Sequence, residues 1–178
     1  ISVTLAPATE LSLESALPPL TEGNTTIEGN LVVLNGALLS AGQIGIAIAS
    51  PGNTIRQLVV VEFPGDGIAI GTPAATGNAV LGCLIGTDGT VARSNGRDGV
   101  RISLGANGNT IGGTTPQDRN IISANRRHGV FLVRETGTLD DTSGNQLLGN
   151  YIGTDASGTV ALGNGECGVR LANGARGN

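Results

Sequence analysis

The stretch Gly67-Ile68-Ala69-Ile70 is one copy of a Gly-Ile/Val-x-Ile/Leu motif that occurs five times in the 178-residue chain. The copies begin at Gly45, Gly67, Gly99, Gly129 and Gly168. Each copy predicts a short strand, because apolar residues alternate with a variable one between turn-forming residues. A unit that recurs with insertions in its turns is typical of a repeat architecture.

Each motif is followed by an asparagine that opens or precedes a second apolar stretch. These asparagines are Asn53, Asn78, Asn109, Asn145 and Asn178. A third apolar stretch follows wherever the chain continues, and helix signals are nearly absent. Three short strands per repeat predict an all-β fold, a parallel β-helix (β-solenoid) of about six to seven coils.

Alternation within the motif predicts which side chains enter the core, because successive strand residues face opposite sides of a sheet. The inward set is Ile46, Ile48, Ile68, Ile70, Val100, Ile102, Val130, Leu132, Val169 and Leu171. The outward set is Ala47, Ala69, Arg101, Phe131 and Arg170. We expect Phe131 to be exposed between Arg101 and Arg170 as a cation-π stack or a lateral contact patch.

The recurrent asparagine predicts a structural turn ladder. At a corner between strands its amide can bond the backbone, tolerate a left-handed conformation and stack on the asparagine of the next coil. No ionisable residue accompanies it, so the pattern favours a ladder over a ligand site.

A longer repeat lies over the short one. NAVLGCLIGTD (Asn78–Asp88) matches NQLLGNYIGTD (Asn145–Asp155), so alternate coils carry the long loops 86–98 and 153–167. Asp88 and Asp155 occupy equivalent turns. Each loop offers a single aspartate rather than the alternating carboxylates of calcium sites, so we expect turn capping and no metal.

Composition and charge exclude several classes of function. The chain has 30 Gly, 2% aromatic and 13% charged residues, a net charge of -4, and ten arginines with no lysine. Scattered arginines do not form the basic stripe that nucleic acid requires, and no apolar run is long enough for a membrane span. Residues 1–66 hold six acids and one arginine (1 - 6 = -5), whereas residues 67–178 hold eight acids and nine arginines (9 - 8 = +1).

Four segments resemble bacterial right-handed parallel β-helix repeat proteins that are secreted or displayed on the cell surface. They are SALPPLTEGNTTIEG (Ser15–Gly29), NTIGG (Asn109–Gly113), RNIISAN (Arg119–Asn125) and GNYIGTDASGTVALGN (Gly149–Asn164). The resemblance covers roughly residues 12–178 and implies a right-handed coil and an extracellular location. It implies no chemistry, because most such proteins have no assigned activity.

We expect a single β-helix domain over 1–178, with N-terminal coils in 1–44 and repeat coils in 45–178. Members of this family usually carry a helical cap before the first coil and further repeats after the last. This sequence shows neither feature, so both ends are expected to be uncapped and open to pairing with another chain. The expected axial contacts are Ile1, Ser2, Val3, Gly174 and Asn178.

Catalytic and metal chemistry find little support. Asp140-Asp141 is the only adjacent acid pair, and we expect it to be a solvated loop tip rather than a hydrolase site. His128 is the only histidine and is expected to be a surface turn residue. Cys83 is expected in the core within a strand, and Cys167 is expected to be free or to cross-link subunits.

The sequence therefore predicts a non-enzymatic extracellular subunit without cofactor that stacks head to tail on itself into a fibre. One alternative is a carbohydrate-binding or carbohydrate-active module, for which Phe63, Phe131 and Tyr151 are the rings available to a polysaccharide. A second alternative is a fragment of a longer surface adhesin.

Overall fold

The computed structural model describes residues 6–135 and 141–178. The first strands are β1 (Glu10–Ser12), β2 (Thr26–Asn35), β3 (Ile46–Ile48), β4 (Thr54–Val61), β5 (Ile68–Gly71), β6 (Ala79–Leu81) and β7 (Leu84–Ile85). The remaining elements are β8 (Val100–Ser103), β9 (Thr110–Gly112), the 3-10 helix η1 (Pro116–Asp118), β10 (Ile121–Ile122), β11 (Val130–Val133), β12 (Gln146–Leu148), β13 (Tyr151–Ile152) and β14 (Val169–Ala172). The predicted all-β class is confirmed.

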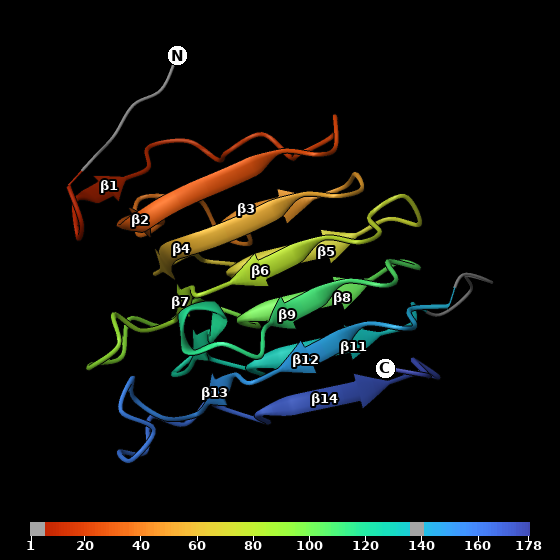
Figure 1. Cartoon of the computed structure of the whole chain (residues 1–178). Coiled ribbons are helices and arrows are strands. Elements are labelled where there is room, and N and C mark those ends of the chain that lie inside the picture. Colours follow the sequence, from red (N-terminus) through yellow and green to blue (C-terminus); the bar gives the residue numbers. More distant parts are fainter. Residues whose placement is uncertain (1–5, 136–140) are drawn as a thin grey trace.

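The strands form two sheets in which every pairing between named strands is parallel. Sheet A has nine strands, with the path β12-β9-β6-β4-β7-β10-β13 and with β2 and β1 joined to it through β4. Sheet B has five, in the order β3-β5-β8-β11-β14. Successive passages lie side by side from β1 and β2 at one end to β13 and β14 at the other, which is consistent with a β-solenoid (Figure 1).

Sheet A bends because β2 and β4 each run across two faces of the molecule. The register between them shifts between Glu28 and Val32, and the corner residues Leu31 and Gln57 have positive φ. In later passages Gly82 occupies the corner between β6 and β7 with φ 62°, a conformation that glycine adopts without strain. The three strands predicted per coil are therefore fused to two in the first passages and separate later.

The aliphatic ladder of sheet B forms the centre of the core. The register stacks Ile46, Ile68, Val100, Val130 and Val169. The side chains of this ladder are buried from β3 to β11, as predicted. The exception is β14, where Val169 is 42% and Leu171 51% exposed because no described strand covers its far edge.

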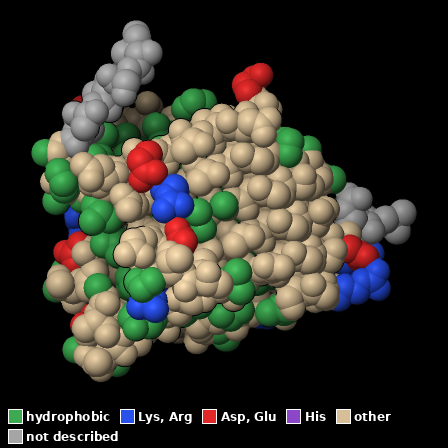
Figure 2. All heavy atoms as spheres, in the orientation of Figure 1, with side chains coloured by type: hydrophobic (Ala, Val, Ile, Leu, Met, Phe, Trp, Pro, Cys, Tyr) green, Lys and Arg blue, Asp and Glu red, His purple; other side chains and the backbone are tan. Residues whose placement is uncertain are grey.

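The face over β2, β4, β6, β9 and β12 is dominated by backbone and uncharged polar groups, with few charged side chains (Figure 2). Among the described residues, no helix is long and apolar enough to cross a membrane.

Candidate functional site

The predicted asparagines form one continuous hydrogen-bonded ladder, which we call the asparagine ladder. Its members are Asn53, Asn78, Asn109, Asn145 and Asn178. In each step the Nδ2 amide donates to the Oδ1 of the next asparagine at 2.9 Å. The backbone N–H of each also donates to the same Oδ1 at 2.7–3.0 Å. Each side chain is thus both donor and acceptor.

Two more asparagine ladders occupy the other corners, and the sequence analysis missed them. In one, Asn95 donates to Asn125 and Asn125 donates to Asn164, both at 3.0 Å. In the other, Asn120 donates to Asn150 at 2.9 Å. A signal for the first was present, since each of its asparagines lies four residues before the glycine of a repeat motif.

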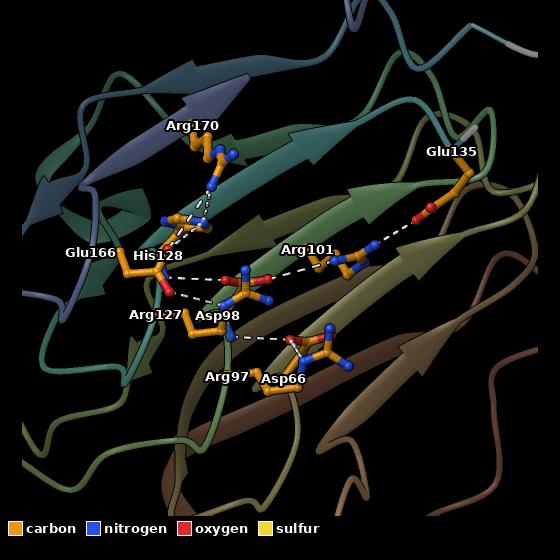
Figure 3. A network of polar contacts seen from close by, with 9 residues as sticks. All are labelled: Asp66, Arg97, Asp98, Arg101, Arg127, His128, Glu135, Glu166 and Arg170. Atoms are coloured by element: carbon orange, nitrogen blue, oxygen red, sulfur yellow. Dashed lines mark hydrogen bonds and ion pairs between the residues drawn. The ribbon is translucent and has the colours of Figure 1, made fainter. Parts of the chain in front are cut away.

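A different polar column occupies the position just before the motif glycine, and we call it the carboxylate–imidazole column. Its members are Asp66, Asp98 and His128. Asp66 Oδ1 accepts the backbone N–H of Asp98 at 3.0 Å, and Asp98 Oδ1 accepts that of His128 at 3.1 Å. His128 Nδ1 accepts the backbone N–H of Cys167 at 3.3 Å. Each side chain therefore binds the backbone of the following coil (Figure 3).

The contacts of His128 assign its tautomer. Because Nδ1 accepts a hydrogen bond from a backbone N–H, the ring proton lies on Nε2. Nε2 is 3.2 Å from Glu166 Oε2 and 3.3 Å from the Arg170 guanidinium, which is itself a donor, so Glu166 is the acceptor. The ring is fully buried, and the expectation of a surface histidine is wrong. The backbone of the next coil and the Glu166–Arg170 pair enclose it.

Arginines and acids surround the column (Figure 3). Arg97 lies 3.8 Å from Asp66 Oδ1, and Arg101 lies 3.7 Å from Asp98 Oδ2 while it also pairs with Glu135. Arg127 pairs with Glu166 at 3.2 Å. Burial raises the pKa of Asp66; the hydrogen bond from Asp98 N–H opposes the rise, and the charge of Asp98 adds to it.

The predicted outward column is in register, since Phe131 pairs with Arg101 on one side and Arg170 on the other. Both guanidinium groups lie over the ring, at 5.2 and 5.4 Å from its centroid. His128 also packs against the ring at 5.0 Å. Phe131 is consequently only 7% exposed, so the expected exposed ring is wrong. Arg101 and Arg170 cover the ring, so the surface at the predicted lateral contact is formed by these arginines and not by Phe131.

The long loops are closed by their aspartates. Asp88 Oδ1 accepts the N–H groups of Thr90 and Val91 at 2.9 and 3.0 Å. Asp155 Oδ1 accepts the Ser157 hydroxyl at 2.7 Å, and this bond leads the interactions that lower the pKa of Asp155. No group of three or more metal-binding side chains occurs within residues 6–135 and 141–178.

The remaining predicted residues lie apart from the column. Ile1, Ser2, Val3 and Asp140 fall outside the described residues. Asp141 is half-buried and pairs with Arg134 and Arg176, so it is not a freely solvated loop tip. Gly174 is exposed with φ 85°, and Asn178 is the last step of the asparagine ladder.

The cysteines and two aromatic residues complete the comparison with the sequence predictions. Cys83 is buried just before β7 rather than within a strand, and burial raises its pKa to about 12. Cys167 is free and exposed. Phe63 is buried in the core, which removes it as a sugar platform. Tyr151 lies under the Arg119 guanidinium at 4.1 Å.

In comparisons with known proteins, the chain matches no family model, no curated protein and no solved structure. The resemblance to surface β-helix repeat proteins therefore depends on the sequence segments themselves.

Proposed function

We propose that this chain is a non-enzymatic, extracellular structural subunit, a right-handed parallel β-helix that stacks head to tail on further copies of itself. The observation that carries the proposal is the open edge of β14, where the ladder residues Val169 and Leu171 are exposed although their counterparts in earlier strands are buried. An exposed apolar strand edge is a template for pairing with another strand.

A general rule and the strand pairing support the proposed handedness and coil number. Connections between parallel strands of one sheet are right-handed in nearly all proteins. Leu20 forms a parallel bridge with Ile48, and β1 pairs with β2, so a partial coil precedes β2 and β3. Counting this partial coil, we propose a β-helix of about six coils.

Each end of the stack has an apolar hollow. Beside β14 a cavity of about 370 Å³ opens between Leu132, Leu147 and the exposed ladder residues. At the other end a cavity of about 740 Å³ is lined mainly by aliphatic side chains, including Leu11 and Leu17. Val169 and Leu171 of one copy would enter the larger cavity of the next, which buries apolar surface on both sides.

The backbone defines a register for this junction. Inward residues donate their backbone N–H to the strand that follows. Val130 N–H donates in this way to the Gly168 carbonyl, and Leu20 N–H donates to the Ala47 carbonyl. Continued across the junction, this pattern pairs Leu171 N–H with the carbonyl of Pro19 in the next copy. Pro19 has no N–H, so the carbonyl of Val169 is left without a donor there. One missing bond weakens the junction without preventing it.

Charge favours head-to-tail over head-to-head contact. Residues 6–35 contain four glutamates and no arginine, whereas residues 169–178 contain two arginines and no acid. Arg170 and Arg176 are exposed. Unlike charges steer encounter of opposite ends, and salt screens this attraction, so high salt should slow assembly.

The contacts of the polar column also support a structural function. Asp66, Asp98 and His128 are buried, and each uses an acceptor atom to bind backbone rather than presenting it to solvent. A general acid or base has to reach a substrate proton within hydrogen-bond distance.

Electron microscopy of the purified chain tests the proposal. We expect fibres with an axial repeat of about 29 Å, which is six coils at about 4.8 Å each. Leu171→Glu should abolish them by placing a charge in the junction, whereas Val91→Glu, in an exposed loop, should not. Pro19→Ala should strengthen assembly by supplying the missing donor. Single rods at every concentration would refute the proposal.

A further inference from the structure

Like the asparagine ladder, the carboxylate–imidazole column joins successive coils through side-chain acceptors of backbone N–H groups, but its carboxylates have no amide donor. In the asparagine ladder each amide accepts a backbone N–H, and each except the last, Asn178, donates to the next side chain. Asp66 and Asp98 keep the accepting function, but ionised carboxylates have no donor. The result is visible at Asp98, whose Oδ2 has no hydrogen-bond partner among the described residues although the side chain is completely buried.

Among the described residues, the neighbouring cations form ion pairs with the two carboxylates, drawn as dashed lines in Figure 3, but none supplies the missing hydrogen bond. Arg101, from β8, lies 3.7 Å from Asp98 Oδ2 and is also bound to Glu135, which follows β11. Arg97 lies 3.8 Å from Asp66 Oδ1. Both separations exceed a normal hydrogen bond.

The groups on the following coil are engaged elsewhere. Arg127 pairs with Glu166. The His128 ring directs its two nitrogens to Cys167 N–H and Glu166, with Arg170 beside them, and only its backbone N–H reaches Asp98.

We propose that the Asp66 carboxylate, which lies against Asp98 of the next coil, is a proton-binding site, and that a proton held there strengthens the coil-to-coil contact as the pH falls. The proton gives Asp66 a donor close to Asp98, whose Oδ2 has no hydrogen-bond partner among the described residues, and it removes one of two like charges from a buried site. The coil stack thereby gains stability in acid at this column.

The direction of the pH effect follows from linkage. The pKa of Asp66 is raised, chiefly by burial, above its value in the unfolded chain. The folded state therefore binds the proton at a pH where the unfolded state does not. Stability contributed by the pair rises as the pH falls through the raised pKa, and the gain is complete below the unfolded value of about 3.9.

A metal ion is a poorer occupant of this position. The described residues contain no group of three metal-binding side chains, and two guanidinium groups already flank the pair. A buried water could donate to Asp98 Oδ2, but it would give the pair no dependence of stability on pH. A proton therefore predicts a pH-dependent stability at this position, and a water predicts a pH-independent one.

Thermal unfolding of the whole chain between about pH 3, below the unfolded pKa, and about pH 8 tests the proposal with the wild type, Asp66→Asn, Asp98→Asn and Asp118→Asn. In the first two variants the new amide carries a permanent donor and keeps the accepting oxygen. Asp118 is a half-buried aspartate outside the column, paired with Arg56, and is the matched control. The measured quantity is the melting temperature of each variant minus that of the wild type, which cancels the titration of all other groups.

We expect Asp66→Asn to melt about 2 to 4 °C above the wild type near pH 8, the shift given by about 1 kcal/mol in a chain of this size, and the difference to shrink as the pH falls toward about 3. The melting temperature of Asp118→Asn should not start above that of the wild type and approach it as the pH falls. A difference that is independent of pH, or an Asp66→Asn variant that melts below the wild type near pH 8, would overturn the proposal. If Asp98→Asn does not fold, Asp66→Asn decides the question alone.

Discussion

The asparagine ladder and the carboxylate–imidazole column bind successive coils through the same kind of contact, a side-chain acceptor that receives the backbone N–H of another coil. They differ in what remains after that bond is made. The amide of Asn109 still donates to Asn145, whereas Asp98 keeps a buried oxygen without a hydrogen-bond partner among the described residues. An amide satisfies itself within a stack at any pH, and a carboxylate needs a proton to do so. The difference shows how one corner geometry can be insensitive or sensitive to pH.

Placing a carboxylate in the asparagine ladder should have the largest effect. Asn109→Asp removes the donor to Asn145 and Ala75 and buries a charge against their oxygens. We expect a loss of about 3 to 5 kcal/mol in the free energy of unfolding at neutral pH, measured by urea denaturation. The loss should shrink in acid as the carboxylate is protonated. A pH-independent loss would break the comparison.

Removing the same side chain should cost somewhat less. Asn109→Ala leaves the backbone N–H and the amide of Asn78 without their acceptor. We expect a loss of about 2 to 4 kcal/mol with no dependence on pH. Asn107→Ala, which removes an exposed asparagine two residues away, should be nearly neutral. Equal effects of the two substitutions would remove the ladder from the account.

Substitution of His128 should have an intermediate effect on the free energy of unfolding. His128→Leu removes the acceptor for Cys167 N–H and the ring contact with Phe131, for which we expect a loss of about 1 to 2 kcal/mol. His128→Asn keeps an acceptor at this position and should recover part of the loss. Identical unfolding midpoints for the two variants would show that the backbone bond contributes nothing.

The smallest effect on stability is expected for Asp88, an exposed aspartate. Its contribution to stability should fall, rather than rise, as the pH falls. Burial alone would raise the pKa of Asp88, but the N–H groups of Val91 and Thr90 and the Thr90 hydroxyl together lower it. A lowered pKa contributes stability above the unfolded value of about 3.9 that is lost as the pH falls through the folded value. Asp88→Ala should therefore be slightly destabilised near neutral pH and match the wild type in strong acid. Thermal melts at both pH values check this.

The sequence predicted the features that recur at fixed positions. The Gly-Ile/Val-x-Ile/Leu motif gave the strands of sheet B and their inward residues, and the recurrent asparagine gave one polar ladder. The prediction missed the Asp66–Asp98 stack because these residues are 32 positions apart. Their contact appears only once the coil register is known, because the two acids are not neighbours in the sequence.

Two side chains were misplaced because alternation predicts direction but not what covers a side chain. Phe131 does point outward from β11, yet Arg101 and Arg170 close over it. His128 does lie in a turn, yet the following coil and Glu166 enclose it. In both cases long side chains from neighbouring coils bury a residue that its own strand would leave exposed.

The most direct test of the contrast between the two ladders is infrared difference spectroscopy of the carboxyl region, with wild type and Asp66→Asn compared across the same pH range. The account predicts a protonated-carboxyl band that appears in the folded wild type above the pH at which ordinary aspartates titrate, and that is absent in Asp66→Asn. Appearance of the band in both proteins at the same pH would contradict it.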